Sequence, residues 1–184
     1  MADDQQVAKG DGNTQIVGDG NISNLTVFQY MPQRPLTHSL IHDLLDVVYF
    51  LPASDDDSYS LQLPAKIPDK LQFNNAAKYM RIIDNHTDDY MRVDDVMKEY
   101  PNSEDVVKKL RDMFLDVAIV DGEGNPCVGD GDAQLDQIKV HLIDTIVTDS
   151  KFDANLYPIE TIEEFCIALI AYGVSKCKIL VNLA

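Results

Sequence analysis

The chain has 184 residues, of which 45% are apolar, and its 31 acidic and 15 basic residues give a formal net charge of −16. This length allows one domain with an appendage, and the apolar content is enough for a core. No apolar run approaches the roughly 18 to 20 residues that cross a bilayer, and the start, MADDQQ, lacks the features of a secretion signal. We therefore expect a cytoplasmic protein without membrane contact. Its negative charge would repel phosphate backbones, so direct binding of nucleic acid is not expected.

Residues 1–31 contain the tetrapeptide GDGN twice, at 10–13 and 18–21. Each copy can supply a tight turn and precedes a segment rich in β-branched residues, TQIV or ISNLTVF. We predict two short strands, which are too small to be stable alone. They could dock on the rest of the chain or stay disordered, but the eight-residue period favours stacking with strands of other copies. The residues that would form this homo-oligomeric contact are Ile16, Val17, Ile22, Leu25 and Val27.

Two prolines, Pro32 and Pro35, interrupt this pattern, because proline fixes φ and removes a backbone donor. We place a domain boundary there, between a β segment at 1–31 and a compact helical domain at 36–184. The predicted fold class is mainly α, with five or six helices and a short N-terminal β segment. The first helix begins near Thr37 or His38, and its apolar residues recur at helical spacing. They are Leu40, Ile41, Leu44, Leu45, Val48 and Leu51.

Four further segments carry helical patterns. Residues 69–100 are predicted to form two helices with a break near 84–88. The next helix begins at Ser103, whose hydroxyl can accept a hydrogen bond from a free N–H, and runs to about Val120. Another covers 133–147. The last begins near Pro158 and is apolar nearly all round, which indicates a central position.

Two histidine-containing sets have some character of a metal site. His38 and His42 share a helix face but lack a third ligand of known position. The segment DNHTDDY gathers three aspartates around His86, namely Asp84, Asp88 and Asp89. Such a set could hold a divalent ion in a small metal-dependent enzyme. Neither set is complete, so we expect no metal and no cofactor.

The remaining motifs do not indicate catalysis. The Gly- and Asp-rich segment 121–132 lacks the spacing of a calcium loop, and no phosphate-binding or dinucleotide-binding glycine pattern occurs. No serine lies in a nucleophile elbow. The spacing of Cys127, Cys166 and Cys177 fits neither a zinc site nor a disulfide framework, and Cys166 lies in an apolar run that predicts a core position. We do not expect an enzyme.

The segment GDGNTQIVGDGN, placed before the helical stretch 71–114, resembles proteins of bacterial biological-conflict loci. The family is that of the ABC-three-component (Lamassu-like) systems, in particular their helical accessory and C-terminal domains. The resemblance implies a prokaryotic defence complex in which a small helical domain connects an ABC-type ATPase with an effector. No catalytic or binding residue carries over from it.

We therefore expect a non-enzymatic assembly or adaptor subunit that acts by oligomerisation and by binding a larger protein. The loops 52–68 and 121–132 are candidates for the binding surface, because helix connections usually have ~2 to 8 residues and long loops tend to carry function. Candidate contacts are Tyr59, Leu61 and Leu63 in the first loop and the acidic Asp121, Glu123 and Asp130 in the second. Two alternatives stay open: a metal-dependent enzyme that uses the acidic His86 region, and an acidic inhibitor that mimics nucleic acid.

Overall fold

The computed structural model describes residues 36–51, 66–150, 152–153 and 157–183. All of them belong to the unit Gln33–Ala184, and the unit Met1–Pro32 lies outside this part of the chain. The two predicted strands and the candidate contact residues of the first long loop therefore lie outside the described residues and stay predictions. These are Ile16, Val17, Ile22, Leu25, Val27, Tyr59, Leu61 and Leu63.

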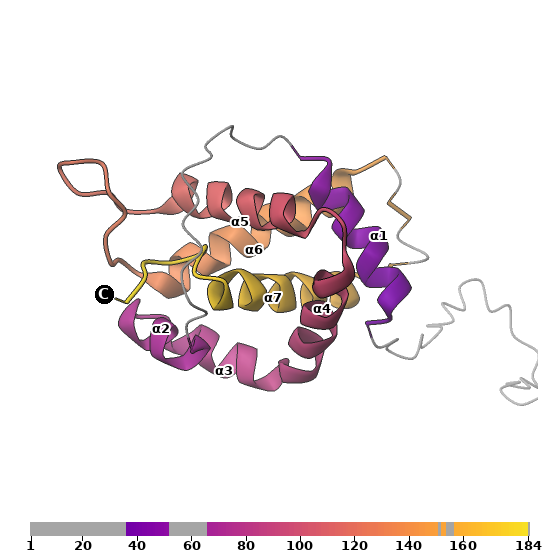
Figure 1. Ribbon diagram of the computed structural model, residues 1–184, viewed down its shortest axis with the longest axis horizontal. Helices are drawn as coiled ribbons and strands as arrows, with labels where there is room; N and C mark the ends of the chain where they lie inside the picture. Colours follow the sequence, from indigo (N-terminus) through magenta and orange to yellow (C-terminus); the bar gives the residue numbers. More distant parts are fainter. Residues whose placement is uncertain (1–35, 52–65, 151, 154–156, 184) are drawn as a thin grey trace, which may run out of the picture. The chain divides into compact units, whose positions relative to one another are not determined.

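The described residues form seven helices and no regular strand, so the mainly α fold is confirmed. Figure 1 shows how these helices are arranged. The number of helices in this part of the chain exceeds the predicted five or six. In chain order they are α1 (His38–Tyr49), α2 (Ile67–Phe73), α3 (Ala77–Asn85), α4 (Thr87–Glu99), α5 (Ser103–Val117), α6 (Gly131–Thr148) and α7 (Ile159–Ser175).

Helices α2, α3 and α4 take the place of the two predicted helices of the segment 69–100. Helix α2 begins at Ile67, so the last residues of the predicted loop 52–68 are helical. The predicted break near 84–88 is confirmed, since His86 caps both α3 and α4. A second break follows Phe73. There Asn75 adopts φ 57°, and the N–H groups of Asn75 and Ala76 donate to the carbonyls of Gln72 and Leu71 at 3.3 and 2.9 Å. This is the hydrogen-bond pattern that closes a helix with a left-handed residue, a position that asparagine tolerates.

The connection between α5 and α6 also differs from the prediction. Helix α5 ends at Val117 rather than near Val120, and α6 begins at Gly131 rather than near 133. Asp130 caps α6 by accepting a hydrogen bond from the N–H of Ala133 at 3.0 Å. Ser103 starts α5 as predicted, but the capping position belongs to Asn102 and carries no side-chain cap. In α1, Thr37 is the cap and accepts from the N–H of Leu40.

Helix α7 is the centre of the domain, as its apolar sequence predicts. Every residue from Phe165 to Ser175 is buried, and α7 packs against α2, α3, α4, α5 and α6 (Figure 1). Cys166 lies fully inside this core, and burial raises the pKa of its thiol. Because all sides of α7 are covered, the other helices can keep polar residues on their outer faces.

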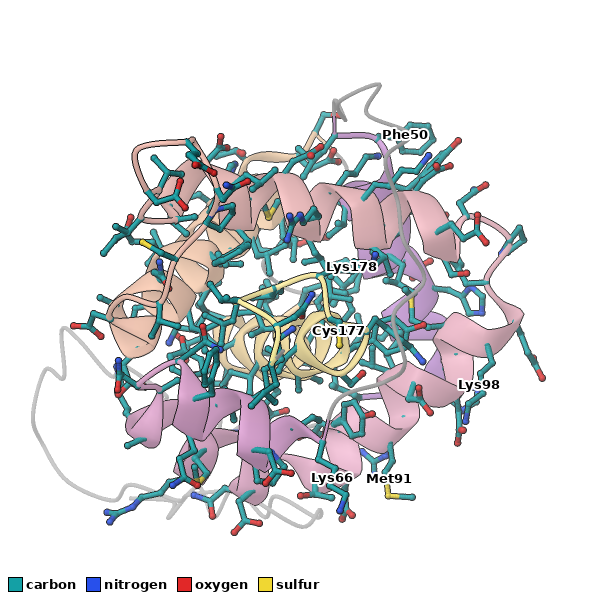
Figure 2. The ribbon with its side chains drawn as sticks, turned by 60° about the vertical axis from the view of Figure 1, so that its left-hand side comes forward. Phe50, Lys66, Met91, Lys98, Cys177 and Lys178 are labelled. Carbon is teal, nitrogen blue, oxygen red and sulfur yellow. The ribbon has the colours of Figure 1, made fainter. Side chains whose placement is uncertain are left out.

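The segment after α7 is tied to α2 by side chains. Asn74, which is fully buried, accepts from the N–H of Val181 and donates to the carbonyl of the same residue, at 3.0 and 2.8 Å. Lys70 donates to Asn182 Oδ1 at 2.7 Å. In Figure 2, Cys177 and Lys178 follow α7 near the middle of the domain, whereas Phe50 and Met91 point outward. No helix among the described residues is long and apolar enough to cross a membrane.

Candidate functional site

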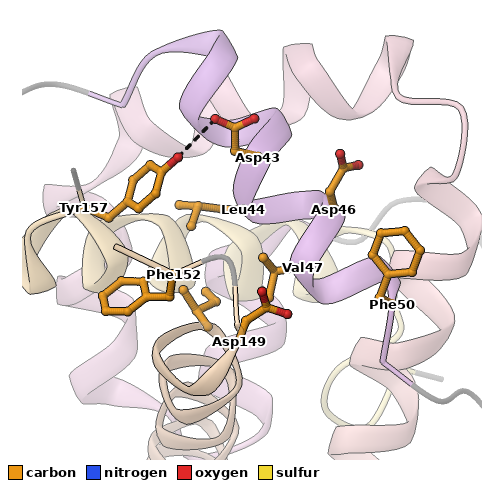
Figure 3. Close-up of a pocket in the computed structure, with 9 residues that line it drawn as sticks. Asp43, Leu44, Asp46, Val47, Phe50, Asp149, Phe152 and Tyr157 are labelled. Atoms are coloured by element: carbon orange, nitrogen blue, oxygen red, sulfur yellow. Dashed lines mark hydrogen bonds between the residues drawn. The ribbon is translucent and has the colours of Figure 1, made fainter. Parts of the chain in front are cut away.

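A cleft with a volume of about 220 Å³ lies between α1 and the connection that follows α6. Its floor is apolar, and aromatic rings and carboxylates surround it, as Figure 3 shows. The lining residues are Asp43, Leu44, Asp46, Val47, Phe50, Ile146, Asp149, Phe152 and Tyr157.

Helix α1 supplies one wall because its two faces differ. Ile41, Leu44, Leu45 and Val48 are buried at helical spacing. The acidic residues of the outer face, Asp43 and Asp46, stand three positions apart, and Phe50 follows the end of the helix with 69% of its surface exposed. Residues three or four apart share a face of a helix, so the amphipathic pattern of α1 places both carboxylates beside the cleft.

The opposite wall comes from the end of α6 and the segment behind it. Asp149 caps the C-terminus of α6, and its carbonyl accepts from the N–H of Phe152 at 3.0 Å. The rings of Phe152 and Tyr157 stack with centroids 6.3 Å apart and an interplanar angle of 28°. This short connection therefore presents a carboxylate beside two stacked rings.

Hydroxyl groups hold the carboxylates of α1 in place. Tyr157 Oη donates to Asp43 Oδ2 at 3.3 Å, and Tyr100 Oη donates to Asp46 Oδ1. Burial, together with the neighbouring aspartate in each case, raises the pKa of Tyr157 and that of Tyr100. Both phenols therefore remain protonated donors at neutral pH.

The electrostatic character of the cleft is negative. None of its described lining residues is a lysine or an arginine, and three are aspartates. Helices α1 and α6 both end beside it, at Tyr49 and Thr148, and the C-terminus of a helix carries a partial negative charge. The cleft thus favours a positively charged group.

The form of the cleft suits an organic cation better than a metal ion. Within the described ranges, no three His, Cys, Asp or Glu side chains lie close enough together to hold a metal. Aromatic rings attract ammonium and guanidinium groups through their faces, and the apolar floor can contact a methylene stem. Drug-sized ligands usually need ~300 to 1,000 Å³, so this volume suits a single side chain rather than a whole metabolite.

A second groove, with a volume of about 490 Å³, lies between α2, α3 and α4. Its walls are largely apolar, with Ile67, Leu71 and Ile83 among them, and Arg81 and Asp84 also line it. Among its described lining residues only Arg81 and Asp84 are charged, and their opposite charges favour neither an anion nor a cation. The groove therefore indicates no particular ligand.

The histidines predicted as metal ligands fall into two separate places. His86 Nδ1 lies 3.1 Å from Asp89 Oδ2, and Arg92 approaches the other oxygen of the same carboxylate at 3.6 Å. Asp84 belongs to the apolar groove, and Asp88 lies exposed in the first turn of α4. The structure therefore joins one histidine to one carboxylate that a cation already neutralises.

The other histidine pair lies on α1. His38 and His42 are both exposed, and the ring of His42 lies 5.6 Å from that of Tyr100. His42 thus has an aromatic neighbour rather than a further metal ligand.

The acidic residues predicted for the second loop lie on a short hairpin. Asp121 Oδ1 accepts from the N–H groups of Glu123 and Asn125, both at 2.9 Å, and these bonds lower the pKa of Asp121. Asp130 caps α6. Two of the three acids therefore shape the connection, and Glu123 is exposed beside them. Their role in partner binding stays a prediction.

The sequence-based search missed the cleft between α1 and α6. The α1 half of the cleft can be recognised in the sequence as two aspartates three positions apart, Asp43 and Asp46, followed by Phe50. The other half of the cleft comes from residues more than 100 positions further on, and periodicity does not show which helix ends meet.

A comparison with known proteins finds no matching family model, no similar curated protein and no similar solved structure. The residues and geometry of this chain are therefore the basis on which its function is inferred.

Proposed function

We propose that the chain is a non-enzymatic adaptor or assembly subunit, and that the cleft between α1 and α6 holds a lysine or arginine side chain of a larger protein partner. The observation that supports this most directly is the joint presence of three carboxylates and three aromatic rings in a cleft of side-chain size. If the resemblance to ABC-three-component systems is correct, the partner is the ATPase or the effector of a defence complex.

A cationic side chain would be bound by several weak contributions. Its charge is stabilised by Asp43, Asp46 and Asp149, and its stem lies against Leu44 and Val47. A cation over an aromatic face contributes about 0.5 to 2 kcal/mol, depending on how far it is desolvated. Surface ion pairs contribute ~0 to 1 kcal/mol each and weaken with salt. One side chain would therefore bind weakly, and a firm complex requires further contacts with the same partner.

The test uses NMR titration of the full-length chain with three short acetylated peptides that differ in one central residue: lysine, arginine or norleucine. Norleucine has the stem of lysine without its charge. We expect saturable shifts at Phe50, Phe152 and Tyr157 with the two cationic peptides, weaker at high salt, and none with norleucine. Equal shifts with all three peptides would contradict the proposed site.

Three variants sharpen this experiment. Asp46→Asn keeps an acceptor for Tyr100 but removes a charge from the cleft, whereas Asp144→Asn removes one charge from the exposed face of α6. Only the first variant should weaken binding. Lys151, outside the described residues, stands two positions from Asp149, so Lys151→Ala is the control for a ligand from the chain itself. Binding that becomes much tighter in this variant would identify Lys151 as the occupant of the cleft and contradict the proposal that a partner's side chain fills it.

A further inference from the structure

A second interaction surface lies on the hairpin that connects α5 to α6. The carbonyl of Ile119 accepts from the N–H of Cys127 at 2.8 Å, and the N–H of Asp121 donates to the carbonyl of Asn125 at 2.9 Å. Val120 and Pro126 face each other between these two bonds as an isolated antiparallel bridge. The segment is therefore a small β-ribbon rather than an irregular loop.

The ribbon is held firmly at its base. Gln134 Nε2 donates to the carbonyl of Val117, and Asn75 Nδ2 donates to the carbonyl of Gly129. The Ile119 side chain lies directly over Gly129, where a Cβ atom would approach its Cδ1 atom to 2.7 Å. A surface fixed in this way loses little conformational freedom on binding.

The two edges of the ribbon differ in what they offer to another strand. In an antiparallel pair, the residues between two closing hydrogen bonds direct their own N–H and C=O groups away from each other. Pro126 has no N–H, so its edge is blocked. Val120 has both groups, and neither finds a hydrogen-bond partner in the described part of the chain. Ala118, next but one along this edge, is also extended.

Exposed apolar side chains lie on the hairpin and close to it in the sequence. Leu115, Ile119, Val120 and Val128 each expose between 38% and 54% of their surface. Proteins usually protect an exposed strand edge with proline, lysine or a covering element. Here proline protects one edge, and the other keeps its hydrogen-bonding groups beside apolar residues. That combination is the recognition mode of proteins that bind an extended peptide as an added strand.

Charge identifies the kind of peptide. Between Arg111 and Lys139 the chain has seven acidic residues and no basic residue: Asp112, Asp116, Asp121, Glu123, Asp130, Asp132 and Asp136. Lys78 neutralises part of this charge by pairing with Asp136 at 2.6 Å. A second copy of the chain has the same net charge of −16, and its predicted strands TQIV and ISNLTVF contain no basic residue. Repulsion therefore disfavours a second copy on this edge.

We propose that the open edge of the hairpin, centred on Val120, binds an extended segment of another protein in which basic and apolar residues alternate. The added strand pairs with the N–H and C=O groups of Val120. Its apolar side chains contact the exposed residues of the hairpin, and its basic side chains face the acidic surroundings. This surface goes beyond the cleft at the other end of α6 and does not depend on it.

The test measures binding of labelled short peptides to the full-length chain by fluorescence anisotropy. The main probe alternates lysine with valine. A second probe has the same sequence but N-methyl groups on the backbone nitrogens of one edge, which removes the donors and keeps the charge. A third replaces lysine by glutamate. We expect the first probe to bind, the second to bind about tenfold more weakly through loss of backbone hydrogen bonds, and the third not to bind.

Hydrogen exchange and one variant locate the site. The amide of Val120 should exchange more slowly when the first probe is bound, and Val120→Pro should weaken binding by about tenfold while circular dichroism shows an unchanged helical domain. Asp46→Asn in the other cleft should leave this binding unchanged. Equal affinity for the methylated and unmethylated probes, or no protection at Val120, would refute strand addition. Protection of Val120 without peptide that disappears on dilution would show that a second copy is the occupant.

Discussion

At the scale of single residues, Asn74 and Gly131 join parts of the chain that are far apart in sequence. The carbonyl of Asn74 accepts from the N–H of Gly131 at 2.9 Å, while its side chain binds Val181. A Cβ atom on Gly131 would lie 2.3 Å from that carbonyl oxygen. Since the oxygen belongs to the backbone, it cannot move aside as a flexible side chain would. Only glycine allows the start of α6 to come so close to the end of α2.

Gly131→Ala should therefore lower the free energy of unfolding by roughly 3 kcal/mol, at the upper end of the usual cost of over-packing. Gly122→Ala is the matched control, because nothing lies within 4 Å of a Cβ atom at Gly122. That change should stay within ~0.5 kcal/mol of the wild type. Urea denaturation of both variants decides the matter, and similar losses in the two would contradict the close approach at Gly131.

Lys70 is a fully buried lysine of α2 whose side chain reaches the end of α7. Its Nζ atom donates to the carbonyl of Val174 at 3.5 Å and to Asn182. Loss of solvent outweighs these bonds and lowers the pKa of Lys70 to about 8. Because the folded pKa lies below the unfolded value near 10.5, the folded state binds this proton less well. The penalty is complete below pH 8 and disappears as the pH rises towards the unfolded value.

The stability of the wild type should accordingly rise between pH 7.5 and 9.5 relative to Lys70→Met, by on the order of 2 kcal/mol. Methionine fills a similar volume without a titratable group. The measured quantity is the difference between the two urea unfolding free energies at each pH. Taking this difference removes the contributions of the other titrating groups. A difference that does not change with pH would show that Lys70 keeps an ordinary pKa.

At the scale of secondary structure elements, the left-handed Asn75 separates α2 from α3. Both Asn75→Gly and Asn75→Ala lose the bond to the carbonyl of Gly129, but only alanine is strained at positive φ, by roughly 1 to 2 kcal/mol. We expect the alanine variant to be less stable than the glycine variant by about that amount. Guanidinium denaturation measures the free energy of unfolding of the two variants. A glycine variant as unstable as the alanine variant would contradict the role of backbone strain.

The helices differ in how well the sequence predicts them. The apolar stripes of α1 and α6 and the apolar sequence of α7 were sufficient to place these helices, because burial follows their periodicity. The end of α2 was missed, since in FNNAA the apolar spacing continues and only the conformation of Asn75 interrupts the helix. The cleft was missed for another reason. Tyr157 reaches Asp43 through packing of α1, α6 and α7, and no local pattern encodes which ends meet.

At the scale of the whole molecule, two candidate surfaces lie at opposite ends of α6. With 18 residues and a rise of 1.5 Å per residue, this helix separates them by about 27 Å. An adaptor could use both at once, and two weak contacts on one rigid element reinforce each other.

The N-terminal repeat permits a separate prediction for the whole chain. Removing residues 1–31 should leave a folded helical domain of lower oligomeric order, because the helices have their own core and the predicted strands are stable only with a partner. Light scattering on the full-length and shortened chains gives the two masses, with circular dichroism as the control for folding. Equal numbers of protomers in the two would show that the repeat does not mediate self-association.

The central position of α7 has a consequence for how the protein is made. The ribosome synthesises α7 after the six other helices, five of which pack against it. A nascent chain that has reached only Thr148 therefore carries the apolar faces that α7 later covers. Domains usually fold as units during synthesis, and exposed apolar surface promotes aggregation in the meantime. The core is therefore incomplete until α7 has been synthesised. During that interval the exposed apolar faces of the nascent helices are available to chaperones that bind apolar segments.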